Sequence, residues 1–142
     1  MTKEDLRQKV WQLLELNAVQ RFPGAHGRIP NFIGAARAAA RLTELAVWKK
    51  ARAIKISPDS PQLAVRRQAL IDGKVVYLAV PSLRTEKCFI EIDPKRLGRR
   101  IALAASLLGA TKYGRVVNPR EVRAIDLVVC GSVGVRRDGM RV

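Results

Sequence analysis

The side chains that could carry out chemistry are few in this chain of 142 residues. His26 is the single histidine, and no G-x-S-x-G or H-E-x-x-H pattern accompanies it, which favours a hydrogen-bonding or solvated role over that of a general base. The carboxylates are scattered, so a paired acid–base site has little support. No Walker loop or G-x-G-x-x-G sequence occurs. Residues 131–134, Gly-Ser-Val-Gly, could admit a ligand close to the backbone or form a simple turn after a strand.

Net charge is the strongest compositional signal, because 27 Lys and Arg residues against 12 Asp and Glu residues give a formal charge of +15. We therefore expect an anionic partner, although a positive field attracts nucleic acids, phosphorylated small molecules and polyanionic cofactors alike. The basic residues occur singly or in pairs, without the long runs of a disordered nucleic-acid arm. Genome composition or a thermophilic source explains the charge equally well. Aromatic residues, at 5%, are too few for the stacking platform of a single-strand nucleic-acid binder.

Length and composition predict one domain over residues 1–142. No apolar run approaches the roughly 18 residues of a membrane span. The charged N-terminus lacks the apolar stretch of a secretory signal, so we expect a soluble cytoplasmic protein. Cys88 and Cys130 each lie in an apolar run without metal-ligand spacing, which predicts two buried thiols and no metal site.

The first part of the chain is expected to be helical with one long interruption. Residues 2–17 begin with a capping pattern and continue with apolar residues at helical spacing. Proline and glycine then break any regular period over residues 19–30, which predicts a loop of functional length. Asn31 is placed to cap a second, alanine-rich helix that extends to about Trp48.

The remaining chain alternates strands with helices. A strand over residues 51–56, a helix over 60–72 followed by Gly73, and a strand over 75–80 together predict a βαβ unit. Further elements are expected as strands at 88–92 and 125–130, a helix start at Asp93-Pro94, a helix over 101–108 ended by Gly109, and a tight turn at Asp138-Gly139. This alternation predicts a layered α/β fold with a mainly parallel sheet, whose ligands lie beyond the carboxyl ends of the strands.

Short motifs along the chain resemble the 5-formyltetrahydrofolate cyclo-ligase family. Residues 3–7, Lys-Glu-Asp-Leu-Arg, match the family's Lys-x-x-Leu-Arg opening helix. Residues 125–129 with Gly131, followed by residues 138–142, look like its Asp-Leu strand and Asp-x-Gly-x-Arg-Leu segment. Residues 28–32 and 54–62, with Arg66, are similar to the divergent branch found in archaea and in larger eukaryotic proteins.

The resemblance implies a three-layer αβα sandwich, as in ribose-phosphate isomerases and CoA transferases, incomplete here at the C-terminus. It also implies ATP and Mg²⁺ as cofactors, with Lys3, Arg7 and Arg141 converging on the nucleotide phosphates. The family's Gly-x-Gly-x-Gly-Tyr-x-Asp nucleotide loop does not occur. The carboxylate that holds the pterin after the first strand is expected at residues 31–34, which read Asn-Phe-Ile-Gly, so Asn31 and Phe32 are the candidate substrate-binding residues.

The resulting hypothesis is a cyclo-ligase-like protein, the N-terminal part of a longer domain. In complete form it would convert 5-formyltetrahydrofolate to 5,10-methenyltetrahydrofolate, or catalyse a related reaction. The alternative is a basic nucleic-acid (RNA)-binding module that retains the fold without catalysis. Partners are expected to be a nucleotide and a folate-like small molecule, with weak, unspecific nucleic-acid binding and a homodimer formed through uncovered apolar surface.

Overall fold

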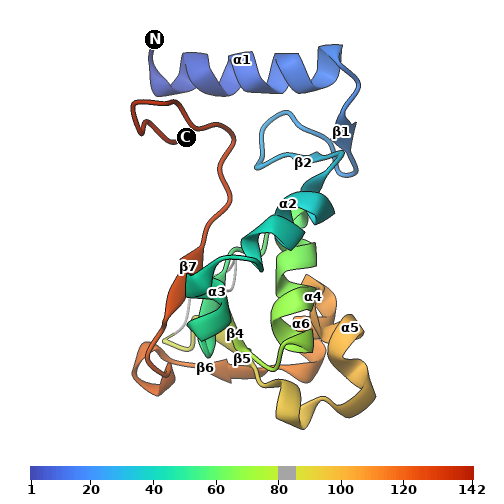
Figure 1. Cartoon of the computed structure of the whole chain (residues 1–142), viewed down its shortest axis with the longest axis vertical. Coiled ribbons are helices and arrows are strands. Elements are labelled where there is room, and N and C mark those ends of the chain that lie inside the picture. The colour runs from blue at the N-terminus through green and yellow to red at the C-terminus, as the bar shows by residue number, and fades with distance from the viewer. Residues whose placement is uncertain (80–85) are drawn as a thin grey trace.

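A five-stranded mixed sheet with the strand order β6-β5-β4-β3-β7 forms the centre of the computed structural model, which describes residues 1–79 and 86–142 (Figure 1). The strands are β3 (Ala53–Ile56), β4 (Val75–Ala79), β5 (Phe89–Ile92), β6 (Arg115–Val117) and β7 (Leu127–Val129). β3 is parallel to both β4 and β7, whereas β5 is antiparallel to its neighbours β4 and β6. Four strands therefore point the same way, and the predicted mainly parallel sheet is confirmed.

Helices pack against this sheet, so the expected α/β class is confirmed. The helices that contribute to its core are α2 (Ala35–Leu42), α3 (Ala46–Lys50), α4 (Leu63–Ile71), α5 (Ile101–Ala104) and α6 (Leu107–Tyr113), and a further helix is α1 (Lys3–Leu16). Four 3₁₀ turns also occur among the described residues: η1 (Ser60–Gln62), η2 (Pro94–Arg96), η3 (Gly98–Arg100) and η4 (Pro119–Glu121). A separate antiparallel pair, β1 (Gln20–Arg21) with β2 (Asn31–Phe32), closes the long loop after α1. No helix in the described part of the chain is long and apolar enough to span a membrane.

The predicted βαβ unit is present as β3-η1-α4-β4. Pro61 lies in the first turn of η1, where its missing N–H costs nothing, and the helix continues directly into α4. Gly73, with a φ of +78°, reverses the chain just past the end of α4, a conformation that favours glycine. The strand then begins at Val75 as expected, and its predicted last residue, Val80, lies outside the described residues.

The two faces of the sheet carry different cores, because successive strand residues point to opposite sides. Ile54, Ile56, Val76 and Leu78 belong to the larger cluster, which takes in residues from α2 to α6. The smaller cluster on the other face consists of Ala53, Val75, Tyr77 and Val117, with Phe89, Val122 and Ile125 packed against it. The segment that connects β6 to β7 therefore covers this second face.

A buried polar network lies within the second face. The Tyr77 hydroxyl donates to Glu91 Oε2 at 2.6 Å, and Arg115 Nη2 donates to Glu91 Oε1 at 3.1 Å. The N–H of Arg123 donates to the Tyr77 hydroxyl at 3.1 Å. Glu91 is only 3% exposed, so a carboxylate at this depth needs these donors to remain charged. The network attaches the β6–β7 connection to the centre of the sheet.

Helix α1 begins as the sequence indicates. The N–H of Asp5 donates to Thr2 Oγ1 at 3.1 Å, and the N–H of Thr2 donates back to Asp5 Oδ2 at 2.7 Å, which completes the predicted capping box. The helix lies away from the sheet and beside the segment that follows β7, so the two ends of the chain are close together (Figure 1).

Asn31 does not cap a helix, and this prediction is wrong. Asn31 lies in β2, where pairing with β1 draws it into extended backbone, and α2 begins after Gly34 with a φ of +98°. The expected single helix to Trp48 is also divided in two. The hydroxyl of Thr43 donates to the Ala40 carbonyl at 2.6 Å, and Leu45 takes an extended conformation before α3.

The helix expected over residues 101–108 has different boundaries. It divides into α5 and α6, and Ser106 caps α6 by accepting the N–H of Gly109 at 3.0 Å. Gly109 therefore lies inside α6 and does not end the helix. A Cβ atom at Gly109 would lie 1.6 Å from the carbonyl oxygen of Leu103, so close approach of the two helices, and not a turn, requires glycine here.

The prediction made for the two cysteines also needs correction. Cys88 is half-buried and Cys130 is exposed, both as free thiols, so the prediction of two buried cysteines is wrong. Cys130 lies just beyond β7, a strand at the edge of the sheet that lacks a neighbour on one side in the described structure.

Strand β6 was not expected, because three residues after a helix are too few to show a strand pattern. The turn at Asp138-Gly139 is confirmed by a φ of +88° at Gly139 and a bridge between Val135 and Arg141.

Candidate functional site

The carboxyl ends of β3 and β7 are joined by two hydrogen bonds. The N–H of Ser57 donates to the Val129 carbonyl at 2.9 Å, and the N–H of Gly131 donates to Ser57 Oγ at 3.2 Å. These contacts hold the segment after β3 against the segment after β7, at the edge of the sheet where a parallel α/β fold binds its ligands.

Gly131 marks the point where several segments converge. A Cβ atom at this position would lie 2.8 Å from Ile29 Cγ2, 2.9 Å from Gln62 Oε1 and 3.2 Å from Asp59 Oδ2. The loop after α1, the turn after β3 and the segment after β7 thus meet around one glycine. Any side chain at residue 131 would push these groups apart, so glycine is required here by packing within the chain. The approach of a ligand to residues 131–134 stays a prediction.

The buried side chain of Arg66 fixes the turn after β3 through hydrogen bonds to its backbone. Its guanidinium donates to the carbonyls of Ser57 at 2.7 Å, Asp59 at 3.0 Å and Ala105 at 2.8 Å. The residue is 2% exposed, and this burial lowers the pKa of Arg66 to about 10, although the nearby Asp59 carboxylate acts in the opposite direction. Three carbonyls on two segments are therefore fixed by one buried cation, and the Asp59 side chain is left available beside Gly131.

Two buried side-chain amide oxygens have no hydrogen-bond donor among the described residues. Gln62 Oε1 and Gln20 Oε1 are both buried, and a buried acceptor without a partner costs free energy. Gln62 is the one that faces Gly131, beside Asp59. A ligand that brought N–H groups to Asp59 and Gln62 would satisfy a carboxylate and an amide oxygen at once.

The predicted substrate residues have different surroundings. The Asn31 side-chain amide donates to the Phe22 carbonyl at 3.0 Å, and its Oδ1 accepts the N–H of Phe32 at 3.0 Å, so Asn31 fixes the loop between β1 and β2. Phe32 lines a hollow of about 320 Å³ together with Arg37 and Arg41 of α2. Strand β2 also lies against η1, which brings this hollow close to the turn after β3.

The predicted phosphate-binding residues lie on the two segments at the chain ends. A Cβ atom at Gly134 would lie 2.9 Å from Val10 Cγ2, so the segment after β7 packs directly on α1, as expected for Lys3, Arg7 and Arg141 to converge. Arg7 forms an ion pair with Glu4 at 3.0 Å on the surface of α1. The meeting of all three cations at one place stays a prediction.

Helix α1 is also attached to the long loop. The Trp11 indole N–H donates to the Arg28 carbonyl at 3.0 Å, and the Trp11 ring lies 4.7 Å from the His26 ring between centroids. His26 is exposed, and its ring packs against Trp11, which helps to attach the loop to α1. Ile29 belongs to the same loop and lies against Gly131. Helix α1, the loop and the carboxyl edge of the sheet therefore form one connected region.

Comparison with known proteins adds to this geometry. The whole of residues 1–142 matches the 5-formyltetrahydrofolate cyclo-ligase family. The chain belongs to this family. Methenyltetrahydrofolate synthase domain-containing proteins are among its relatives: the cattle (Bos taurus) protein is 37% identical over 145 residues, and the mouse (Mus musculus) and human (Homo sapiens) proteins are 35% and 32% identical. Each match covers 100% of this chain but only 38%, 39% and 38% of the relative, so the chain spans less than two fifths of these relatives' length.

The substrate-binding position expected at Asn31 and Phe32 stays a prediction. Both residues lie in β2 of the small two-stranded sheet, whereas the first strand of the main sheet is β3. The residues that follow β3 are Ser57 to Gln62, and they include the carboxylate of Asp59. The sequence already indicated this segment as a possible ligand-binding position, because a strand followed by Ser-Pro-Asp was predicted there and ligands lie beyond the ends of parallel strands. Sequence reasoning missed Gln20 and Gln62, whose buried amides appear only once the segments are packed.

Proposed function

We propose that this chain forms part of a cyclo-ligase-like site that binds 5-formyltetrahydrofolate at the carboxyl ends of β3 and β7. The observation that carries this proposal is the pair formed by Asp59 and the unpartnered amide oxygen of Gln62 beside Gly131. A pterin ring presents N–H groups along one edge, and a carboxylate next to an amide oxygen is a suitable pair of acceptors for them. The carboxylate after the first strand is also the group that the family resemblance implies.

The nucleotide part of the proposal involves α1 and the segment after β7. Lys3, Arg7 and Arg141 lie on these two adjoining segments, and three cations suit the phosphates of ATP. When bound, ATP with Mg²⁺ supplies the phosphoryl group that activates the formyl oxygen of the substrate. No cluster of three or more His, Cys, Asp or Glu side chains among the described residues could hold a metal. The residues present therefore suit a Mg²⁺ ion that is held mainly by the phosphates.

The roles of the chain's own residues follow from this arrangement. Asp59 and Gln62 would orient the ring, and the cations would stabilise charge on the phosphates, so the reaction needs no protein nucleophile. Ring closure then takes place on the activated formyl carbon as phosphate leaves, which yields 5,10-methenyltetrahydrofolate. Arg66 contributes by fixing the carbonyls of Ser57 and Asp59, and it is a positioning residue.

Calorimetric titration of 5-formyltetrahydrofolate into the chain, with ATP and Mg²⁺ present, tests the proposal. Asp59→Asn keeps the shape of the side chain and removes its charge, and we expect at least about tenfold weaker folate binding. Glu44→Gln, an exposed carboxylate after α2, serves as the matched control and should leave the affinity unchanged. The proposal is wrong if the wild-type chain does not bind the folate, or if Asp59→Asn binds it as tightly as wild type does.

A further inference from the structure

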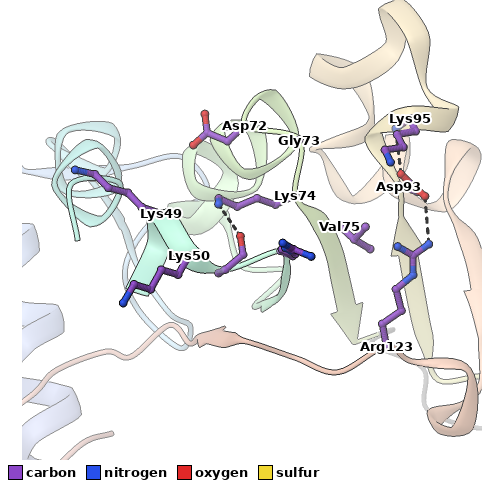
Figure 2. Close-up of a pocket in the computed structure, with 11 residues that line it drawn as sticks. Lys49, Lys50, Asp72, Gly73, Lys74, Val75, Asp93, Lys95 and Arg123 are labelled. Carbon is purple, nitrogen blue, oxygen red and sulfur yellow. Dashed lines mark hydrogen bonds and ion pairs between the residues drawn. The ribbon is translucent and has the colours of Figure 1, made fainter. Parts of the chain in front are cut away.

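A second, strongly basic cleft lies at the opposite edge of the sheet, where β3 and β4 begin and β5 ends (Figure 2). Its volume is about 850 Å³. Six cationic residues line it, against the two carboxylates Asp72 and Asp93. The cations are Lys49, Lys50, Arg52, Lys74, Lys95 and Arg123. They come from the end of α3, the starts of β3 and β4, η2 and the β6–β7 connection, so the fold brings together charges that are distant in sequence.

Lys74 is the buried member of this group. It is 6% exposed, its Nζ donates to the Ala51 carbonyl at 2.7 Å, and the Nζ lies 5.5 Å from the centroid of the Trp48 ring. Lys74 takes part in none of the ion pairs between described residues. An ammonium group has three N–H donors, and one of them is used by the carbonyl. A buried cation without a carboxylate is unusual, because burial is costly unless the charge is compensated.

The carboxylates around the cleft are already engaged by other donors. Asp72 accepts the Trp48 indole N–H at 2.9 Å and the Gln68 amide at 2.8 Å. Asp93 accepts Arg123 at 3.4 Å and the N–H of Lys95 at 3.0 Å.

A third carboxylate, that of Asp126, is bonded to the backbone at the start of β3, next to the cleft residue Arg52. It accepts the N–H groups of Arg52 and Ala53 at 2.8 and 3.0 Å. The pKa of Asp126 is lowered mainly by the hydrogen bond from the N–H of Ala53 and then by that from the N–H of Arg52. The charges of Arg52 and Lys74 lower it further. Its charge offsets part of the cleft's field, but its Oδ2 is occupied by the backbone, and six cations still exceed the three carboxylates.

The rim cations have no comparable partners. The side chains of Lys49, Lys50, Arg52 and Lys95 are exposed and form no side-chain hydrogen bond or ion pair within the described structure. The position of Lys49 and Lys50 in the last turn of α3 agrees with the helix dipole, which accounts for these two alone. Helix geometry does not account for Arg52, Lys74 and Lys95, which come from separate segments.

We propose that this cleft binds a small anion that carries two or more phosphate groups, with the Lys74 ammonium at its base and Arg52 and Lys95 on its rim. The volume lies within the range of small-molecule sites, and several phosphates match several separated cations. The one tryptophan of the cleft region, Trp48, is 1% exposed, so it offers no face on which a nucleic-acid base could stack. The site is distinct from the folate and nucleotide region, which lies at the other ends of the same strands.

Inorganic tripolyphosphate is a suitable probe, titrated calorimetrically into the whole chain at physiological salt. Lys74→Met removes the buried charge while keeping an unbranched side chain against Trp48, and we expect at least about tenfold weaker binding. The double variant Arg52→Ala/Lys95→Ala changes only exposed rim side chains, so it tests the cleft even if Lys74→Met fails to fold. Arg67→Ala/Arg120→Ala removes two exposed cations elsewhere and should bind as wild type does.

Two further arms separate this site from other sources of binding. The Arg7→Ala variant removes one cation of the proposed nucleotide site, which a triphosphate can also occupy, so the tripolyphosphate binding that persists in this variant belongs to the cleft. An oligouridine should compete only weakly with tripolyphosphate, because the proposed site takes a small phosphate compound and not a nucleic-acid backbone. The proposal is overturned if wild type does not bind tripolyphosphate, if the cleft variants bind it unchanged, if Arg7→Ala abolishes binding, or if only oligouridine binds.

Discussion

Single residues decide how the candidate folate site is held, and Arg66 is the clearest case. One buried guanidinium supplies donors to three carbonyls on two segments, of which Ala105 lies 39 residues from Arg66 in sequence. Its neighbour Arg67, also in α4, has the same charge and is exposed. The pair thus allows a comparison of two arginines, one of which is structural.

Replacement of Arg66 by methionine should lower the free energy of unfolding by about 3–5 kcal/mol, because three carbonyls lose their donor and the Asp59 carboxylate loses the nearby charge of Arg66. Arg66→Lys should recover only part of this loss, since one ammonium cannot reproduce the planar fork. Arg67→Met should change the free energy by no more than about 0.5 kcal/mol. Urea unfolding measures all three, and an Arg66→Met variant as stable as Arg67→Met would contradict the assignment.

The Glu91 network makes stability depend on acid pH. Burial alone would raise the pKa of Glu91, but the hydrogen bonds from Tyr77 and Arg115 and the nearby guanidinium charges hold it below its ordinary value of 4.5. The unfolded chain then binds this proton more readily than the folded chain, so protonation favours unfolding. Stability contributed by Glu91 is complete above pH 4.5 and is lost as the pH falls through the lower folded value.

The melting temperature of wild type should therefore fall below pH 4.5, and Glu91→Gln should show a smaller fall over the same interval. Glu44→Gln, at an exposed position, should follow the wild-type curve. Thermal unfolding followed by circular dichroism between pH 7 and pH 3 provides the comparison. If Glu91→Gln had the same pH dependence as wild type, the network would not be responsible.

At the scale of elements, the packing of α1 on the segment after β7 controls the proposed nucleotide site. Val10 of α1 and Gly134 touch, and Trp11 ties the same helix to the Arg28 carbonyl. Lys3 and Arg7 therefore move with α1, whereas Arg141 moves with the last turn. A shared ligand should couple these two elements, and independent surface cations should not be coupled.

A double-mutant cycle on ATP affinity tests this coupling. Arg7→Ala and Arg141→Ala should each weaken ATP binding, and the loss in the double variant should differ from the sum by about 0.5 kcal/mol or more if both contact the same phosphates. Arg7→Ala combined with Arg137→Ala should be additive. Strict additivity for both pairs, or ATP affinity unaffected by Arg7→Ala, would show that the three cations do not converge.

At the scale of the whole molecule, charge and uncovered apolar surface make separate contributions to association. The excess of +15 attracts any polyanion, yet the described aromatic side chains form no exposed stacking surface in the basic cleft. Strand β7 lies at the sheet edge, with Val128 52% exposed and Val135 68% exposed in the segment that follows. An apolar sheet edge favours addition of another strand, so a second copy of the chain is the expected partner there.

Nucleic-acid binding should be weak and independent of sequence, and should be lost between about 50 and 200 mM salt, since only phosphate contacts contribute. Fluorescence anisotropy with one RNA and its scrambled version measures this. Tight binding to one RNA at physiological salt would favour the alternative function, a nucleic-acid-binding module.

Self-association should increase with concentration and decrease in Val128→Lys, because a charge at an edge strand opposes strand addition. Val116→Lys on β6, the other edge strand, is the matched control and should associate as wild type does. Sedimentation equilibrium distinguishes the two variants. A wild-type chain that remains monomeric at high concentration would disprove the prediction of a homodimer.

Local signals in the sequence determined the α/β class, the βαβ unit, the capping box of α1 and the turn at Asp138-Gly139, because each depends on neighbouring residues or on hydrophobic periodicity. Where tertiary pairing overrides local preference, sequence reasoning failed. Asn31 had the properties of a helix cap, but pairing with β1 placed it in a strand.

Only the tertiary structure decided the two sites. Ile29, Asp59, Gln62 and Gly131 span about a hundred positions of the chain and meet because β3 and β7 are adjacent and parallel. Lys74 becomes a buried, unpaired cation only when α3 and the start of β4 are packed together. Contacts between distant segments are set by strand order and packing, and neither leaves a periodic signal in a single sequence.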